Sequence, residues 1–221
     1  MMINNLFGLI LLLLFQINAI AADRSFTGWQ KTKEEKDITV YMKESETDGL
    51  LAFGGVGELD EPFMKVASVL MDVSRLTEWM ADLEVSKVVR WTAPNRYIEF
   101  DHIGTPFVIK DREFLTEVNV TIPKEKNSIT FQNHDVEDPE FPKDKYVRGK
   151  LEGSTFELTS IDGGKRTKFH AEIHADPMGG LPKWVVNLFQ KGWPIDTFNN
   201  LKKQLKKPDL KTHPKITELL G

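Results

Sequence analysis

An α+β fold, with a curved antiparallel β-sheet wrapped around one long C-terminal helix, is predicted by three features of the sequence. Segments that alternate apolar and polar residues fill most of the chain between residues 38 and 175. Turns rich in Gly, Asn and Asp separate these segments, as is typical of an antiparallel meander. From Pro182 to Leu205 the apolar residues instead recur at helical spacing. Shorter helices are expected near the N-terminus.

The first 22 residues form a separate segment. They contain no charged side chain, an apolar run from Leu6 to Phe15, and Ala19-Ile20-Ala21-Ala22 before the first charge at Asp23. We interpret residues 1–22 as a signal peptide, although the usual Lys or Arg near the start is missing. Retention as a membrane anchor is the alternative. The rest is predicted to form one domain over residues 23–207, followed by a C-terminal tail over residues 208–221.

Cysteine content and charge indicate a localisation and the possible binding partners. The chain has no cysteine, so export without disulfides favours a bacterial periplasm or secretion. Residues 181–221 contain eight Lys and three acidic residues, whereas the formal net charge of the chain is -4. A basic C-terminal helix can touch an anionic membrane surface transiently, and a solvated helix face is the alternative. We expect a monomer that binds no nucleic acid.

The N-terminal part is predicted to contain two helices and two strands. A short helical segment is expected around Arg24 to Lys33. Strands are expected at residues 38–42 and 51–53, the second of them followed by Gly-Gly-Val-Gly. Pro62 begins a helix with apolar residues at helical spacing, which continues to Met80 after a break.

The central part is predicted to be a long antiparallel meander. Its strands are expected at residues 84–91, 96–103, 106–121, 128–133, 147–160 and 166–175. The fifth strand is expected to turn near Gly153, and Asp162-Gly-Gly is expected to form a hairpin turn. Residues 134–145 are acidic and contain two prolines, which predicts a surface loop.

The C-terminal part is predicted to be a kinked helix. The last strand ends at Asp176-Pro177, the chain turns through Gly179 and Gly180, and the helix begins at Pro182. Its apolar stripe consists of Trp184, Val185, Leu188, Ile195, Phe198, Leu201 and Leu205. Gly192 and Pro194 predict a kink. A helix across the concave face of such a sheet is the helix-grip arrangement, and an extended tail with little packing is expected after Lys207.

Two segments carry a resemblance to a known family. Residues 106–114 read PFVIKDREF, and residues 174–187 read HADPMGGLPKWVVN. Together with Trp79-Met80, they resemble the signature regions of the START domain, the steroidogenic acute regulatory protein-related lipid transfer domain. The resemblance runs from about Trp29 to about Lys207 and implies a helix-grip fold with a lipid cavity between sheet and helix.

The charged cluster of the first segment supplies the main site candidates. We expect Val108, Lys110, Arg112 and Phe114 on one face of a strand. The resemblance implies that Arg112 lies in the cavity near a carboxylate of the neighbouring strand, where Tyr97, Glu99 and Asp101 share one face. Arg112 with Asp101 or Glu99 is then expected to anchor a polar lipid head or a hydroxyl group through ordered water. A purely structural ion pair is the alternative.

Apolar residues complete the predicted site. They are expected either to line the cavity or to belong to the ordinary core: Phe107, Phe114, Trp184, Leu188, Phe189 and Phe198. His170, Glu172 and His174 alternate on one face of the last strand, at a spacing that zinc ligands use. Because the other face is apolar, we expect them on the solvent side and predict no metal site. No cofactor is expected.

Three functions are compatible with these features. The first is a noncatalytic carrier of one lipid or other hydrophobic molecule, such as a sterol, phospholipid or fatty acid. The second is a cyclase-, aromatase- or hydrolase-like enzyme on the same fold, with Glu99, Asp101 and Arg112 as its machinery. The third is a binding protein for another protein. Common motifs of serine hydrolases, phosphate-binding loops and zinc proteases are absent from the sequence.

Overall fold

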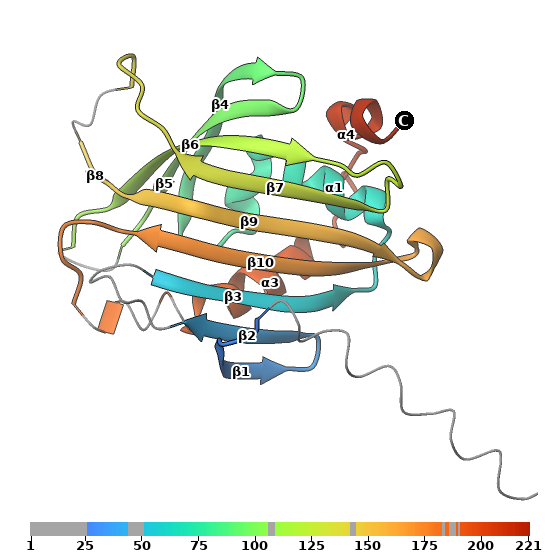
Figure 1. Ribbon diagram of the computed structural model, residues 1–221, viewed down its shortest axis with the longest axis horizontal. Coiled ribbons are helices and arrows are strands. Elements are labelled where there is room, and N and C mark those ends of the chain that lie inside the picture. Colours follow the sequence, from blue (N-terminus) through green and yellow to red (C-terminus); the bar gives the residue numbers. More distant parts are fainter. Residues whose placement is uncertain are drawn as a thin grey trace, which may run out of the picture.

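The chain folds into a large curved antiparallel sheet with helices α1 and α3 behind it, as predicted (Figure 1). The computed structural model describes residues 26–43, 51–105, 109–141, 145–182, 184, 185, 189 and 191–221. Its strands are β1 Gln30–Glu35, β2 Ile38–Lys43, β3 Leu51–Leu59, β4 Leu83–Ala93, β5 Arg96–Ile103, β6 Arg112–Thr121, β7 Ser128–Asp135, β8 Val147–Arg148, β9 Lys150–Ile161 and β10 Arg166–Asp176. Its helices are α1 Phe63–Met71, α3 Trp193–Gln204 and α4 Pro214–Leu220, with short 3-10 helices η1 Val73–Glu78 and η2 Asp162–Gly164.

The strand order places the N-terminal strands beside the last strand of the chain. Along the sheet the order is β1-β2-β3-β10-β9-β7-β6-β5-β4, and every neighbouring pair on this path is antiparallel. The short strand β8 pairs in parallel with β6, off this path. Strand β3 lies beside β10, the last strand. The sheet is therefore a meander with one long-range pairing at its centre.

Two glycines of β3 allow other parts to pack closely on the strand. A Cβ atom on Gly54 would lie 2.4 Å from the carbonyl oxygen of Ala171 and 2.7 Å from the Phe26 ring. A Cβ atom on Gly57 would lie 2.7 Å from the Phe198 ring of α3. The Gly-Gly-Val-Gly segment therefore belongs to the strand, where the missing side chains make room for aromatic rings on both faces.

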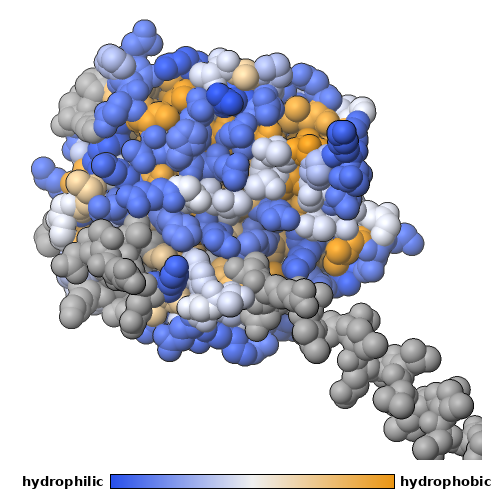
Figure 2. Space-filling model, viewed as in Figure 1, coloured by the Kyte–Doolittle hydropathy of each residue, from blue (hydrophilic) through white to orange (hydrophobic). Residues whose placement is uncertain are grey.

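The main core lies between the concave face of the sheet, α1 and α3. Phe198 of α3 contacts Phe169 of β10, with ring centroids 5.7 Å apart. Just after α3, Lys206 lies 2.6 Å from Glu61 and Lys207 lies 2.7 Å from Glu78. The opposite face of the sheet is largely hydrophilic, as Figure 2 shows. One-sided burial of this kind explains the alternating pattern of the strands.

In the described part of the chain, no helix has the length and apolar character needed to cross a membrane.

The predicted N-terminal helix is wrong where the structure describes it. Residues 30–35 form β1, an edge strand paired with β2, and residues 24 and 25 lie outside the described residues. The Gln, Lys and Glu side chains that suggested a helix are weak local determinants, because the unpaired edge of β2 offers backbone hydrogen bonds to this segment.

Two details of the predicted strands are also wrong. The strand expected from residue 106 begins only at Arg112, and residues 109–111 lie outside it. Lys110 therefore does not share a strand face with Arg112, and Val108 lies outside the described residues. Gly153 does not make a turn. It sits inside β9 at a β-bulge with a φ of 82°, a backbone conformation that suits glycine.

The C-terminal tail is packed, against the prediction. Residues 214–220 form α4, whose Ile216 is fully buried against the core near α1. The main-chain amide of His213 donates a hydrogen bond to the Ser68 hydroxyl of α1 (3.0 Å). Pro208 and Pro214 favour an extended tail, but Pro214 occupies the first turn of α4, where a missing N–H costs nothing.

Candidate functional site

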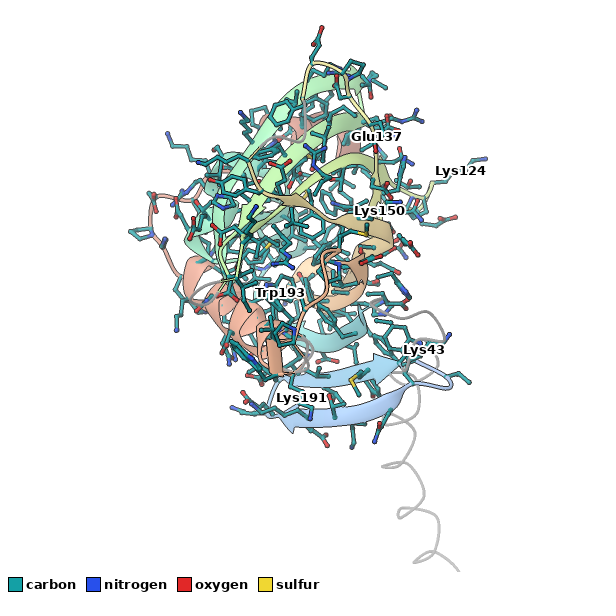
Figure 3. The ribbon with its side chains drawn as sticks, turned by 90° about the vertical axis from the view of Figure 1, so that its left-hand side faces the viewer. Lys43, Lys124, Glu137, Lys150, Lys191 and Trp193 are labelled. Carbon is teal, nitrogen blue, oxygen red and sulfur yellow. The ribbon has the colours of Figure 1, made fainter. Side chains whose placement is uncertain are left out.

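A largely apolar cavity lies between the concave face of the sheet, η1 and the start of α3. Its volume is about 140 Å³, counted as the space open to the centre of a water-sized molecule. Its apolar lining includes Phe53, Leu70, Leu76, Trp79, Met80, Leu83, Ile103, Phe114, Val118, Phe131, Leu151, Phe156, Ile173, Ala175, Leu181, Phe189 and Trp193. Figure 3 shows Trp193 between α3 and the sheet.

Adjacent strands β5 and β6 form the polar end of the cavity. Tyr97, Glu99 and Asp101 alternate along β5 and all line the cavity. Asp101 lies opposite Phe114 of β6, which also lines it. The predicted shared face of β5 and its pairing with β6 are therefore confirmed, since side chains two residues apart point to the same side.

Arg112 lines the cavity but does not pair with the carboxylates of β5. Its Nε donates to the carbonyl oxygen of Pro177 (3.2 Å) and its Nη2 to that of Met178 (3.1 Å). Its Nη1 donates to the carbonyl oxygen of Lys110. The side chain is 4% exposed, and burial lowers the pKa of its guanidinium. The expected ion pair with Asp101 or Glu99 is thus replaced by three main-chain acceptors.

The buried Glu99 and the partly buried Asp101 form an acid pair in the cavity. Burial, more than the charge of Asp101, holds the pKa of Glu99 well above its ordinary value. Burial likewise raises the pKa of Asp101 to about 6. The Ser86 hydroxyl donates to Glu99 Oε1 at 3.4 Å. Two carboxyl groups this close in a low dielectric favour a state in which they share a proton.

The predicted aromatic and aliphatic site residues have different positions. Phe114 and Phe189 line the cavity. Phe198 is buried in the core beneath it, against Gly57 and Phe169, and does not line it. Trp184 is 51% exposed and lies outside the cavity lining. Phe107 and Leu188 lie outside the described residues.

Several lining residues were not predicted as part of the site. Phe53, Ile173 and Ala175 come from β3 and β10, and the ring of Trp193 lies 5.8 Å from that of Phe53. The apolar alternation of the last strand indicated that Ile173 and Ala175 face inward, but only the pairing of β3 with β10 places Phe53 beside them. Asn133 of β7 also lines the cavity. The strand that contains it was predicted, but no face of the sheet was assigned to its side chain.

One group of potential metal ligands lies near the loop before β6. Single ligand atoms of Glu84, His102 and Asp111 lie within 4.8 Å of one another. However, Asp111 approaches Nε2 of His102 (3.0 Å), whereas Glu84 approaches Nδ1 (3.6 Å). Because the carboxylates lie at opposite ring nitrogens, the imidazole links them and does not share a metal with them. The ring also stacks on Tyr146.

The histidines of β10 are partly covered on the outer face of the sheet. His170 packs edge-on against Phe26 (4.9 Å between centroids), and His174 packs against Trp29 (5.7 Å). Glu172 lies between the two histidines, 3.2 Å from His170 Nε2 and 3.6 Å from His174 Nε2. These contacts attach the segment before β1 to the sheet. Burial among them lowers the pKa of His170.

Comparison with known proteins agrees with this architecture. The family model described as "START domain" matches residues 16–211. Phosphatidylcholine transfer protein of Bos taurus is 22% identical over 173 residues, which cover 74% of this chain and 77% of that protein.

Two solved structures share the fold. Human StAR-related lipid transfer protein 5 superposes with a TM-score of 0.75 and 21% identity, covering 83% of this chain and 88% of that one. A STAR-related lipid transfer protein from Xanthomonas axonopodis gives a TM-score of 0.70 and 22% identity, covering 81% of this chain and 99% of that one.

Proposed function

The chain belongs to the START domain family, and from this premise we propose that it is a noncatalytic carrier that holds one lipid-like molecule. The observation that carries the proposal is the apolar cavity between the sheet and the C-terminal helix region. A relative named for phosphatidylcholine transfer supports a lipid ligand in general terms. Each methylene group that a ligand buries there would contribute about 0.8 kcal/mol.

The segment after β10 is the proposed gate. Pro177 and Leu181 line the cavity, and Met178, Gly179 and Gly180 between them all have positive φ values. Arg112 holds this segment through two carbonyl groups. Asp176 Oδ1 also accepts a hydrogen bond from the Met178 amide at 2.8 Å. Local release of a short segment held by these two side chains would widen the exit for a ligand.

We propose that transient membrane contact occurs at the same segment. Met178 and Trp184 are 40% and 51% exposed. Exposed methionine and tryptophan side chains beside a cavity mouth can enter the interfacial region of a bilayer. The segment just after α3 suits this role less well, because Lys206 and Lys207 are already paired with acids of the body.

We also propose that the protein acts in the bacterial periplasm or after secretion. This rests on the uncharged, apolar segment over residues 1–22 and on the lack of cysteine. Fractionation of cells that express the full chain, with N-terminal sequencing of the product, tests it. A product that begins near Asp23 in the periplasm or medium supports export with cleavage, and an intact chain in the membrane fraction supports the anchor.

A transfer assay tests the carrier function. Donor vesicles that contain a self-quenched fluorescent phospholipid are mixed with unlabelled acceptor vesicles, and dequenching is followed with and without protein. Ala175→Trp places an indole in the cavity and should abolish acceleration by the protein. Ala93→Trp, at the end of β4 and outside the lining, should leave it intact. Equal activity of both variants would argue against the cavity as the carrier site.

One observation favours a second candidate, an enzyme on the same frame. The raised pKa of Glu99 would suit a general acid that protonates a bound carbonyl group. The mostly apolar lining speaks against a hydrolase, which must admit water. Chemical change of an extracted ligand by the wild type, and its loss in Glu99→Gln, would favour the enzyme.

A further inference from the structure

The polar end of the cavity contains acceptor atoms that lack partners. Asp101 Oδ1 and Asn133 Oδ1 are buried and have no hydrogen-bond partner within the described structure, and both residues line the cavity. Thr116 Oγ1 is also buried without a partner, on a side chain only 1% exposed. Unpaired buried polar atoms are costly, and a partner that is missing from the protein can be supplied by a ligand.

These atoms lie on the same face of neighbouring strands, the face that lines the cavity at Asp101 and Asn133 but not at Thr116 itself. Thr116 lies directly opposite Glu99 in the pairing of β5 with β6, so their side chains project from the same face. Thr116 alternates with Phe114 and Val118, both of which line the cavity. Asn133 lies opposite Val118 in the next strand pair. The acid pair and the two neutral side chains therefore form one polar patch, made of Glu99, Asp101, Thr116 and Asn133.

Among the described residues, no cation neutralises this patch. The groups that act on the two carboxyls are Ser86, Tyr97 and each other, and none of them is basic. Arg112 lines the same cavity, but its three nitrogens donate to the main-chain carbonyls of residues 110, 177 and 178. The patch is thus rich in acceptors, and the nearby guanidinium already has its partners.

We propose that the cavity selects ligands whose polar end donates hydrogen bonds, such as a hydroxyl or an ammonium group, and discriminates against ligands that end in a carboxylate. This inference rests on the proposed carrier function and names the ligand class of the same cavity. A hydroxyl group can donate to Asp101 Oδ1 or Asn133 Oδ1. An anionic carboxylate would instead place a third acid beside Glu99 and Asp101, where like charges repel strongly at low dielectric.

The two donor ligands should differ in their response to pH. A hydroxyl group can both donate to the pair and accept from it, so it is compatible with the shared proton of Glu99 and Asp101. An ammonium group is bound most strongly when both carboxyls are ionised, so its binding releases that proton to solvent. Affinity for an amine should therefore rise with pH, while affinity for an alcohol should stay flat or fall.

The test uses three single-chain probes of equal length: dodecanol, dodecylamine and dodecanoate. Each displaces a neutral solvatochromic dye from the mature protein, and the concentration for half-displacement is measured at pH 7 below the critical micelle concentration. We expect the alcohol and the amine to displace the dye at concentrations about tenfold or more below that of the carboxylate. The double variant Glu99→Gln/Asp101→Asn should lose this preference. Glu117→Gln, on the opposite face of β6, should keep it.

The outcomes separate this inference from the carrier function. If all three probes displace the dye equally, or the carboxylate displaces it best, the selectivity is wrong while the carrier function stands. If neither dye nor probes bind, the carrier function itself fails. The three probes with the wild type alone decide whether the cavity is selective, so the inference can be tested even if the double variant does not fold. In that case, the single variant Asp101→Asn tests whether the polar patch causes the selectivity.

Discussion

Arg112, at the start of β6, donates a hydrogen bond from its Nε to the main-chain carbonyl oxygen of Pro177, at 3.2 Å and 65 residues further along the chain. With the bond to Met178, this contact ties the beginning of one central strand to the segment that follows the last strand. The arginine thus acts on the wall of the cavity and is not free to bind an anionic ligand head.

Replacing Arg112 by Leu should destabilise the fold and speed ligand exchange. Three carbonyl groups lose their donor, and we expect a loss of about 2–4 kcal/mol in the free energy of unfolding. Urea unfolding and stopped-flow dye release measure the two effects. Affinity should fall alike for ligands with polar and apolar ends. A selective loss for anionic heads would show that Arg112 binds the head after all. Arg96→Leu, on the exposed side of β5, is the control.

The regular parts of the fold could be predicted because their signals are local. Strand β5 was predicted with its observed bounds, and the helix expected to begin at Pro62 is α1, with Pro62 as its N-cap. Alternation placed Tyr97, Glu99 and Asp101 on one face, and the short connection to β6 made the two strands neighbours. The two-residue period of a strand and the start of a helix are set by residues that are close together in the chain. Both can therefore be predicted from a single sequence.

The errors come from partners that are distant in sequence. The acceptors of Arg112 are main-chain carbonyls of a loop after β10, and a side-chain pattern carries no information about them. Pro214 is compatible with both a helix start and an extended tail, and only the site near α1 that receives Ile216 decides between them. The same holds for β1, which becomes a strand because β2 has a free edge.

Gly57→Ala should be much more damaging than Gly55→Ala. A Cβ at residue 57 would lie 2.5 Å from the carbonyl oxygen of Asp37 and 2.7 Å from the Phe198 ring, whereas at residue 55 the nearest atom is 3.3 Å away. We expect a loss of about 2–3 kcal/mol for the first substitution and less than about 1 kcal/mol for the second. Thermal or urea unfolding compares the two. Equal losses would contradict the close packing of α3 on β3.

Removing the acid pair should change how stability depends on pH. The folded pKa of Asp101 is about 6 and that of Glu99 is also raised, so the folded protein retains protons that the unfolded chain loses above about pH 4. Their contribution is therefore fully present at low pH and is lost as the pH rises through the folded pKa values. Relative to wild type, Glu99→Gln/Asp101→Asn should gain about 2 kcal/mol between pH 4 and 8.

Urea unfolding at several pH values measures this difference. The comparison with Glu117→Gln, whose side chain lies on the other face of β6, removes general effects of charge. A double variant whose pH profile runs parallel to that of the wild type would show that the pair carries no shared proton in the folded protein.

Ile216→Ala should weaken the attachment of α4 to the body. Ile216 is fully buried in the main core cluster near α1, so we expect a loss of about 2–4 kcal/mol. Leu219→Ala, on a partly buried side chain of the same helix, should cost less. Amide hydrogen exchange should show faster exchange in residues 214–220 for Ile216→Ala. Unchanged exchange and stability would mean that α4 does not stabilise the domain.

Native mass spectrometry of the protein purified from an expressing host shows directly whether the cavity carries one lipid-like molecule. We expect a second species that is heavier than the bare chain by the mass of one hydrophobic molecule and that is lost in Ala175→Trp. Organic extraction should then identify a ligand that ends in a hydroxyl or an amine. A well-folded wild type found only at the mass of the bare chain, even after incubation with a host lipid extract, would contradict the carrier function.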